Sequence, residues 1–286
     1  MVAARHPRRS GRAGPVTDVR RARLDAELVR RGLARSREHA AELIAAGRVS
    51  LYGRTAAKPA TAVDPGAPVL VITDPDDEHW ASRGAHKLLG ALDAFADVQV
   101  AGRRCLDAGA STGGFTDVLL RRGAAEVVAV DVGYGHLIWR LRNDPQVAVL
   151  ERTNVRYLQP ADIGGGVDLI VADLSFISLV TVLPALTGLT KPGADLIPMV
   201  KPQFEIGRER LGNGGVVRDP EQRAETVLTV AEAAAGLGWA TVGVTASPLP
   251  GPSGNVEYFL HARADRPVDR QRTGELVAAA VAAGPS

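Results

Sequence analysis

Lysine is scarce in this chain. Only four of its 34 basic residues are lysine, namely Lys58, Lys87, Lys191 and Lys201, and all the others are arginine. Arginine keeps its proton under ordinary conditions, whereas a desolvated lysine beside other cations can lose its proton and act as a base. Each lysine is therefore either residual surface charge or a candidate for proton chemistry.

Three further shortages limit the class of protein. Cys105 is the single cysteine, which excludes an internal disulfide and fits a reducing cytoplasm. No apolar run approaches the ~20 residues that a membrane-spanning helix needs, and the arginine-rich N-terminus lacks the apolar core of a secretory signal. Histidine, cysteine and acidic residues do not cluster at metal-ligand spacing. We therefore expect a cytoplasmic protein without a membrane partner or a bound metal.

Charge is unevenly distributed along the chain. Residues 1–60 carry 14 Lys and Arg against 5 Asp and Glu, a net charge of +9, so that the remainder carries −7 of the total of +2. A basic head on a mildly acidic body suggests a polyanionic partner, although a solvated arginine surface would give the same count. Residues 1–20 are rich in Arg, Gly and Pro without periodicity, and we expect them to form a disordered basic tail.

Residues 21–73 are predicted to form a small α+β domain. Leu24 and Leu28 lie on one face of a first helix, and Ser36 is a suitable N-cap for a second helix. Short strand-like stretches follow up to the end of the domain. The polar, acidic residues 74–82 are the expected linker to the rest of the chain.

Residues 83–286 alternate between short apolar runs and helical segments. Such alternation predicts a parallel sheet covered by helices on both faces. The fold class expected is therefore α/β, with a Rossmann-like, mostly parallel and doubly wound sheet. The predicted strands are 104–107, 127–131, 147–151, 168–173, 195–200, 239–246 and 256–262, and the predicted helices are 114–122, 179–189, 219–238 and 274–283.

The strongest local signal is the segment LDAGASTGGFT, residues 106–116. Asp107 ends a predicted strand, and three glycines let the backbone approach a ligand closely before a helix begins. Asp131 ends the next strand, at about the distance that nucleoside-binding folds use to hold ribose hydroxyls. The pattern predicts a site for an adenosine-type ligand; the alternative is a structural strand–helix turn.

The same segment indicates which ligand binds. Its glycine spacing is not GxGxxG, and it has no phosphate-binding lysine. An acidic residue two positions before a glycine at the end of a strand is typical of S-adenosylmethionine sites, and an NAD-dependent dehydrogenase is the weaker alternative. The predicted cofactor-binding residues are Asp107, Gly109, Ser111, Thr112, Gly113, Gly114, Phe115, Asp131, Asn154 and Asp173.

Five segments, read in order, resemble the TlyA family of ribosomal RNA 2′-O-methyltransferases, whose catalytic half is FtsJ-like. They are SRGAHKL, LDAGASTGGFT, ADLSFISL, VKPQFE and GPSGNVEYF. The resemblance extends over nearly the whole predicted ordered chain. It implies a class I methyltransferase fold, S-adenosylmethionine as the cofactor, and cytidines of small- and large-subunit ribosomal RNA as targets, at sites that affect capreomycin sensitivity.

The resemblance also implies a catalytic set. FtsJ-like enzymes use two lysines, an aspartate and a glutamate, and the matching positions here are Lys87, Asp173, Lys201 and Glu257. A ribose 2′-hydroxyl is a poor nucleophile until its proton is removed, and a desolvated lysine near a second cation can remove it near neutral pH. Lys201 is therefore the predicted general base, with the two carboxylates orienting the lysines.

The N-terminal domain resembles the small RNA-binding domain first known from a ribosomal small-subunit protein. The segment that carries this resemblance begins RLDAELVRRGLARSREHAAELI. Basic side chains on such a domain contact phosphates and position an RNA without reading its sequence. The predicted RNA-binding residues are Arg21, Arg23, Arg35, Arg37, Arg48 and Lys58.

Two alternatives to the enzyme remain open. Members of this family are often labelled haemolysins, but a membrane-lytic protein needs an apolar or strongly amphipathic segment, which the sequence lacks. An RNA-binding assembly factor without turnover is the other alternative, and the complete catalytic set argues against it. Residues 203–218 are predicted to form a long glycine-rich loop after Lys201, either a cover for the target nucleotide or an ordinary connection.

Overall fold

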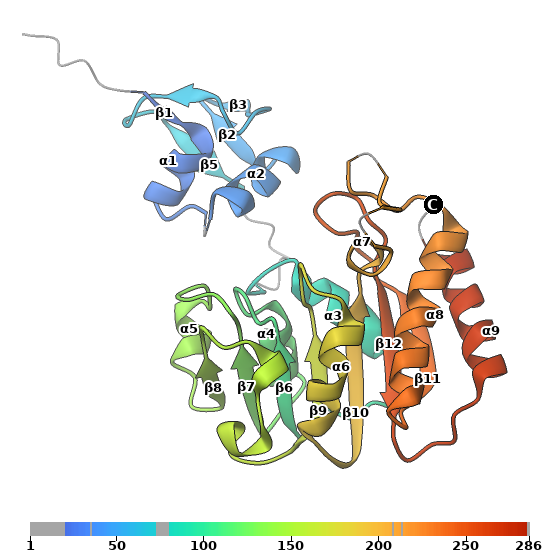
Figure 1. Cartoon of the computed structure of the whole chain (residues 1–286). Coiled ribbons are helices and arrows are strands. Elements are labelled where there is room, and N and C mark those ends of the chain that lie inside the picture. The colour runs from blue at the N-terminus through green and yellow to red at the C-terminus, as the bar shows by residue number, and fades with distance from the viewer. Residues whose placement is uncertain (1–20, 35, 73–79, 208, 213, 285–286) are drawn as a thin grey trace, which may run out of the picture. The chain divides into compact units, whose positions relative to one another are not determined.

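The computed structural model describes residues 21–34, 36–72, 80–207, 209–212 and 214–284. The chain divides into two compact units, Met1–Glu78 and His79–Ser286, each of which is described by itself (Figure 1). The predicted basic tail, most of the predicted linker and Arg35 lie outside the described residues.

The N-terminal unit packs two short helices against small antiparallel sheets. Ser36 caps the second helix, since its hydroxyl accepts a hydrogen bond from the amide of His39 at 3.1 Å. Leu24, Leu28 and Ile44 are buried in its core. The elements are β1 (Ala22–Arg23), α1 (Leu24–Arg30), α2 (Arg37–Ala45), β2 (Val49–Leu51), β3 (Arg54–Thr55), β4 (Ala62–Val63) and β5 (Val69–Val71).

The C-terminal unit is built on a seven-stranded sheet with the order β11-β12-β10-β9-β6-β7-β8. Strands β10, β9, β6, β7 and β8 run parallel, and β12 is antiparallel to both of its neighbours. The predicted α/β fold with a mostly parallel sheet is confirmed. The strands are β6 (Arg104–Ala108), β7 (Glu126–Val130), β8 (Val147–Leu150), β9 (Val167–Ala172), β10 (Thr190–Val200), β11 (Ala240–Ala246) and β12 (Tyr258–Arg263).

Helices cover both faces of this sheet (Figure 1). On β9, Leu169 and Val171 face the helices α3 and α4, whereas Ile170 and Ala172 face α6, α8 and α9. This alternation with period two places an apolar layer on each side, as a buried parallel sheet requires. The helices are α3 (Gly84–Ala94), α4 (Gly114–Arg121), α5 (Trp139–Arg142), α6 (Leu179–Gly188), α7 (Pro202–Glu205), α8 (Pro220–Gly236) and α9 (Arg270–Ala283).

The structure corrects three of the predicted boundaries. Helix α9 begins at Arg270 rather than at residue 274. Residues 202–205 form the helix α7, so the predicted loop 203–218 begins about three residues too early. Pro202 occupies the first helical position, where its missing amide costs no hydrogen bond, and four residues are too few to show a helical period. Strand β10 starts at Thr190 rather than at residue 195, and its register with β9 shifts between these two positions. A Pro-Gly pair lies in this part of the strand, which is why the sequence did not predict it as a strand.

None of the helices in the described part of the chain combines the length and the apolar character needed to cross a membrane.

Candidate active site

The strand order brings the predicted site residues into one row. Asp107 and Asp131 lie at the carboxyl ends of β6 and β7, while Asp173 and Lys201 follow β9 and β10. Glu257 precedes β12, and because β12 is antiparallel to β10, its start lies at the same edge. Along the sheet the row therefore reads Glu257, Lys201, Asp173, Asp107, Asp131. The carboxyl edge of a parallel sheet is where doubly wound folds place their ligands.

Lys201 is held by the segment that follows β9. Its Nζ lies 2.5 Å from Asp173 Oδ1 and donates a hydrogen bond to Ser175 Oγ at 2.9 Å. The contact between Lys201 Nζ and Asp173 Oδ1 is an ion pair whose geometry is not that of a hydrogen bond. The Lys201 side chain is only 10% exposed, so that this pair lies in a largely dehydrated place. The backbone amide of Asp173 donates to the carbonyl of Ala108 at 2.9 Å, which ties the segment to the neighbouring strand.

Lys87 and Glu257 form a second, deeper pair. Lys87 Nζ on α3 donates to Glu257 Oε2 at 2.5 Å, and both side chains are buried. The other carboxylate oxygen, Oε1, has no hydrogen-bond partner among the residues that the structure describes. A Cβ at Gly251 would lie 2.6 Å from that oxygen, so glycine is needed for the turn to pass beside the carboxylate. Removing one partner of such a buried pair leaves an uncompensated charge.

The three predicted glycines of the loop 109–114 are all sterically required. Gly109 has φ +90°, and a Cβ there would lie 2.4 Å from the carbonyl oxygen of Asp173. A Cβ at Gly113 would meet Leu141, and one at Gly114 would meet Ser82, each at 2.3 Å. The sequence predicted close approach of this backbone to a ligand. In the structure the close neighbours are atoms of the protein itself, so the glycines allow the loop to fold tightly against β9, α5 and α3.

Asp131 holds the same loop from the next strand. Its two oxygens accept hydrogen bonds from the amides of Ser111 at 2.8 Å and Gly133 at 2.6 Å. Ser111 has φ +48°, a strained conformation for a residue with a side chain, and the bond to Asp131 stabilises it. The carbonyl of Thr112 accepts from the amide of Ile138 at 3.3 Å. The loop is thus preorganised by this chain's own groups.

Two of the predicted cofactor-binding residues, Phe115 and Asn154, have contacts within the protein itself. Phe115 is buried in the core, with its ring 6.0 Å from that of Phe259. Asn154 is exposed after β8 and caps the short 3₁₀ helix Val155–Tyr157 by accepting from the amide of Arg156 at 3.0 Å.

Asp107 is the most perturbed acid of the site. It is fully buried; Oδ2 accepts from the hydroxyl of Thr116 at 2.7 Å, and Oδ1 has no partner among the described residues. Burial raises the pKa of Asp107 to about 7, and the negative charges of Asp173 and Asp131 add to the rise. Three carboxyl groups on adjacent strands favour a cationic ligand over a pyrophosphate. S-adenosylmethionine, with its sulfonium and ammonium groups, fits this donor set.

The structure also brings in three residues that the sequence reasoning did not single out. Ser175 bonds Lys201, and Glu205 accepts hydrogen bonds from the start of α6. Phe176 is 91% exposed, has φ +65°, and places its ring 5.3 Å from that of Phe204. All lie within the recognised segments ADLSFISL and VKPQFE, but serine, phenylalanine and a single glutamate carry no spacing signal by which sequence alone could assign them.

In the N-terminal unit two predicted RNA-binding arginines share one carboxylate. Arg23 donates to Asp25 at 3.0 and 2.8 Å, and Arg37 donates to the same side chain at 3.0 Å. The two guanidinium groups are more than half exposed, whereas Asp25 is buried. They hold the pKa of the Asp25 carboxyl far below its usual range.

The other predicted RNA-binding residues are placed separately. Arg21 is exposed and pairs with Asp64 at 3.2 Å. Arg48 donates to the carbonyl of Ile72 at 3.0 Å, and Lys58 is exposed.

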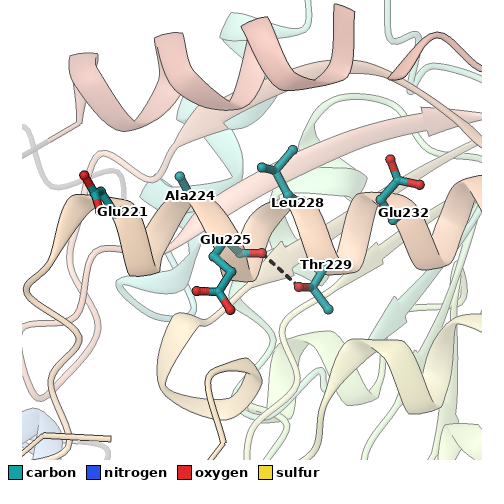
Figure 2. A pocket seen from close by; sticks show the side chains of 6 residues that line it. All are labelled: Glu221, Ala224, Glu225, Leu228, Thr229 and Glu232. Atoms are coloured by element: carbon teal, nitrogen blue, oxygen red, sulfur yellow. Dashed lines mark hydrogen bonds between the residues drawn. The ribbon is translucent and has the colours of Figure 1, made fainter. Parts of the chain in front are cut away.

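A pocket of about 620 Å³ lies along α8 and contains none of the predicted catalytic residues. Figure 2 shows that three of its side chains are glutamates and that a hydrogen bond joins Thr229 to the backbone of Glu225. No group of three or more His, Cys, Asp or Glu residues in the described ranges could hold a metal ion.

Comparison with protein families assigns both units. Residues 80–264 match the FtsJ-like methyltransferase family, and residues 22–69 match the S4 domain. The first match covers more than half of the chain and contains all four predicted catalytic residues.

Individual relatives agree with these matches. The 16S/23S rRNA (cytidine-2′-O)-methyltransferase TlyA of Mycobacterium tuberculosis is 65% identical over 93% of this chain and all of its own length. Hemolysin A of Brachyspira hyodysenteriae is 33% identical over 84% of this chain and 98% of its own, so the haemolysin name occurs within the same family. A solved structure from Streptococcus thermophilus, which also carries a hemolysin name, is 37% identical, covers 92% of this chain and 96% of its own, and has a TM-score of 0.72. This chain therefore belongs to the TlyA family of S-adenosylmethionine-dependent, FtsJ-like methyltransferases.

Proposed function

We propose that this enzyme transfers a methyl group from S-adenosylmethionine to the ribose 2′-hydroxyl of cytidine in ribosomal RNA of both subunits. The M. tuberculosis relative bears that activity in its name, and all of its length aligns with this chain. The observation that carries the proposal is the buried lysine Lys201, which lies beside Asp173 and Ser175 in the row of carboxylates that fits the cofactor. A ribosomal RNA substrate would place the enzyme in the cytoplasm.

Lys201 is the proposed general base. As a neutral amine it accepts the proton of the 2′-hydroxyl, which makes the oxygen a competent nucleophile. Asp173, 2.5 Å away, stabilises the ammonium ion that forms, and Ser175 fixes the direction of the amine. The bound cofactor supplies a methyl group on a positively charged sulfur, which becomes neutral when the methyl group leaves.

Lys87 and Glu257 have a different proposed role. Their mutual contact at 2.5 Å neutralises Lys87 and fixes it beside the row. The unpaired oxygen of Glu257 remains as a hydrogen-bond acceptor for the incoming ribose.

The cofactor is proposed to bind at the carboxyl ends of β6 and β7. Asp131 would hold the ribose hydroxyls of the cofactor, the backbone of residues 109–114 would line its methionine end, and Asp107 would offer its unpaired oxygen to the cationic groups. Phe176, which is 91% exposed and lies two residues before Ser178, the N-cap of α6, would stack on a base of the RNA.

The N-terminal unit is proposed to hold the RNA. Arg23 and Arg37, fixed on Asp25, present two cationic edges to phosphates, and Arg21, Arg48 and Lys58 add further contacts; the same role is proposed for Arg35, which lies outside the described residues. Such contacts position a substrate without selecting the target nucleotide.

The test is to incubate purified protein with S-adenosylmethionine and ribosomal subunits that lack the modification, and to map 2′-O-methylation by nucleotide-resolution sequencing. We expect new methylation at cytidines of both subunits with the wild type and its loss with Lys201→Ala. Lys191→Ala is the matched control, because Lys191 pairs with Asp168 on the surface. RNA that is bound but never methylated would instead identify a non-catalytic assembly factor, and full activity of Lys201→Ala would refute the assignment of the base.

A further inference from the structure

Two segments that are distant in sequence form a ladder of contacts beside the catalytic row. One runs from Asp173 to Leu179 and joins β9 to α6; the other is Lys201 followed by α7. Lys201 contacts Asp173 and Ser175 at the first rung, and the rings of Phe176 and Phe204 lie 5.3 Å apart at the second. Glu205 makes the third rung.

Glu205 accepts two hydrogen bonds at the start of α6. Oε2 accepts from the hydroxyl of Ser178 at 2.6 Å, and Oε1 accepts from the backbone amide of Leu179 at 2.8 Å. The first amides of a helix have no partner within the helix and carry a partial positive charge. A carboxylate from another element is therefore a strong acceptor here, and it fastens α6 to α7.

The segment between the two anchor points is held by side-chain packing, in which Leu174 and Ile177 lie against the core, rather than by its backbone. The backbone amides of residues 174–177 make no hydrogen bond among the described residues. Phe176 adopts φ +65°, a strained conformation for a residue with a side chain. The segment is fastened at one end by Asp173, whose amide bonds β6, and at the other end by Glu205. Ser175, the hydrogen-bond partner of Lys201, lies between these two points.

We propose that Glu205 is a positioning residue, whose carboxylate fixes residues 174–178 against α7 and so holds Ser175 and Asp173 in place around Lys201. The proposal rests on the proposed function, in which Lys201 accepts the proton of the ribose hydroxyl. Glu205 touches none of the reacting groups and acts through Ser178 and Leu179.

Burial of the Glu205 carboxylate is energetically unfavourable, which supports a specific role for this side chain. Burial raises the pKa of Glu205, so that the surroundings disfavour its charge, and the bonds from Ser178 and Leu179 oppose this rise. A residue of the same length without charge would fill the same space at lower cost. The carboxylate instead offers two acceptor oxygens, which reach two donors on the neighbouring segment.

The experiment compares Glu205→Gln, Ser178→Ala and the double variant with the wild type. Glutamine keeps the shape but offers one acceptor oxygen instead of two. Asp269→Asn is the matched control, because Asp269 also caps a helix, α9, by accepting from the amide of Arg272 at 2.9 Å, and does so at an exposed position. Each protein is assayed for kcat, for KM with ribosomal subunits, for the Kd of S-adenosylmethionine and for the pH dependence of kcat. The amide resonance of Leu179 is followed by NMR.

We expect Glu205→Gln to lower kcat by about 10- to 100-fold, as small misplacements of a catalytic group do, while KM and the cofactor Kd change less than about three-fold. The acidic limb of the pH profile should move, because the surroundings of Lys201 change. The Leu179 amide proton should shift upfield when it loses its carboxylate acceptor. The double variant should be no worse than Glu205→Gln, since both changes break one connection.

Three results would overturn the proposal. The first is a kcat and a pH profile for Glu205→Gln that match those of Asp269→Asn. The second is a fall in kcat with a parallel loss of cofactor affinity and melting temperature, which a merely structural role would produce. The third is an unchanged Leu179 resonance. A wild type that methylates no ribosomal RNA would refute the proposed function instead, and the NMR measurement would still decide whether Glu205 fastens α6.

Discussion

Asp107→Asn should remove a pH dependence from the stability of the C-terminal unit. Burial raises the pKa of Asp107 from an ordinary value of 3.8 to about 7. Between these two values the folded state binds a proton that the unfolded state releases, so the stability of the wild type falls as the pH rises. Three pKa units correspond to roughly 4 kcal/mol, of which about 2 kcal/mol is lost between pH 5.5 and pH 8. Asparagine at this position cannot ionise and lacks this contribution.

The measurement is urea unfolding of the full chain at several pH values, followed by tryptophan fluorescence. The three tryptophans, Trp80, Trp139 and Trp239, all belong to the C-terminal unit, so that the signal reports the unit that contains Asp107. We expect the free energy of unfolding of Asp107→Asn, relative to the wild type, to rise by about 2 kcal/mol from pH 5.5 to pH 8. Asp93→Asn, a change at an exposed aspartate of α3, is the control and should give a difference that does not vary with pH. A constant difference for Asp107→Asn as well would refute the reasoning.

Three further predictions concern other parts of the chain. Glu257→Gln should destabilise the C-terminal unit by about 3–5 kcal/mol in urea unfolding because it leaves Lys87 buried without its partner, and Lys87→Met combined with Glu257→Gln should cost less than the sum of the single changes. Gly109→Ala should abolish S-adenosylmethionine binding in calorimetry, because the added methyl group would lie 2.4 Å from a backbone carbonyl oxygen and the loop would have to move. Arg37→Ala should weaken binding to ribosomal RNA and lower the slope of log K against log salt by about one, as the loss of one phosphate contact does.

Two of these predictions, those for Gly109 and Arg37, have a control within the chain. Gly165 also has positive φ but has open space around it, so Gly165→Ala should leave cofactor binding intact. Arg31 bonds Glu27 and the carbonyls of Ala67 and Pro65, so Arg31→Ala should destabilise the N-terminal unit without changing the salt slope. Equal effects of the control and the test variant would contradict the corresponding prediction.

Local signals were sufficient to predict most of the fold. Ser36 and Asp219 cap α2 and α8 as their residue types predict, and the apolar runs of β6, β7 and β9 mark strands to within one residue. The signals failed where an element was too short to have a period, as in α7, or where Pro and Gly interrupted a strand, as at the start of β10.

The resemblance of motifs identified the four catalytic candidates, but not how they pair. Lys87 and Glu257 are 170 positions apart, and nothing in either segment indicates that they bond each other. The same holds for the contacts of Lys201 with Asp173 and Ser175. The glycines of the loop 109–114 were expected to let the backbone approach a ligand, and the structure adds that protein atoms occupy the space where their Cβ atoms would lie. A motif states which residue types are present, and packing decides what each of them touches.

The sequence by itself determined the α/β class, the basic N-terminal domain and the residue types of the site, because caps, apolar periods and glycine-rich turns act over a few neighbouring positions. Only the tertiary structure decided that β12 enters the sheet antiparallel beside β10, which brings Glu257 to the edge where Lys201 and Asp173 lie. It also decided that three of the scarce lysines have different partners: Lys87 a buried glutamate, Lys201 an aspartate and a serine, and Lys191 a surface aspartate. Those environments depend on strand order and burial, which no local pattern of residues specifies.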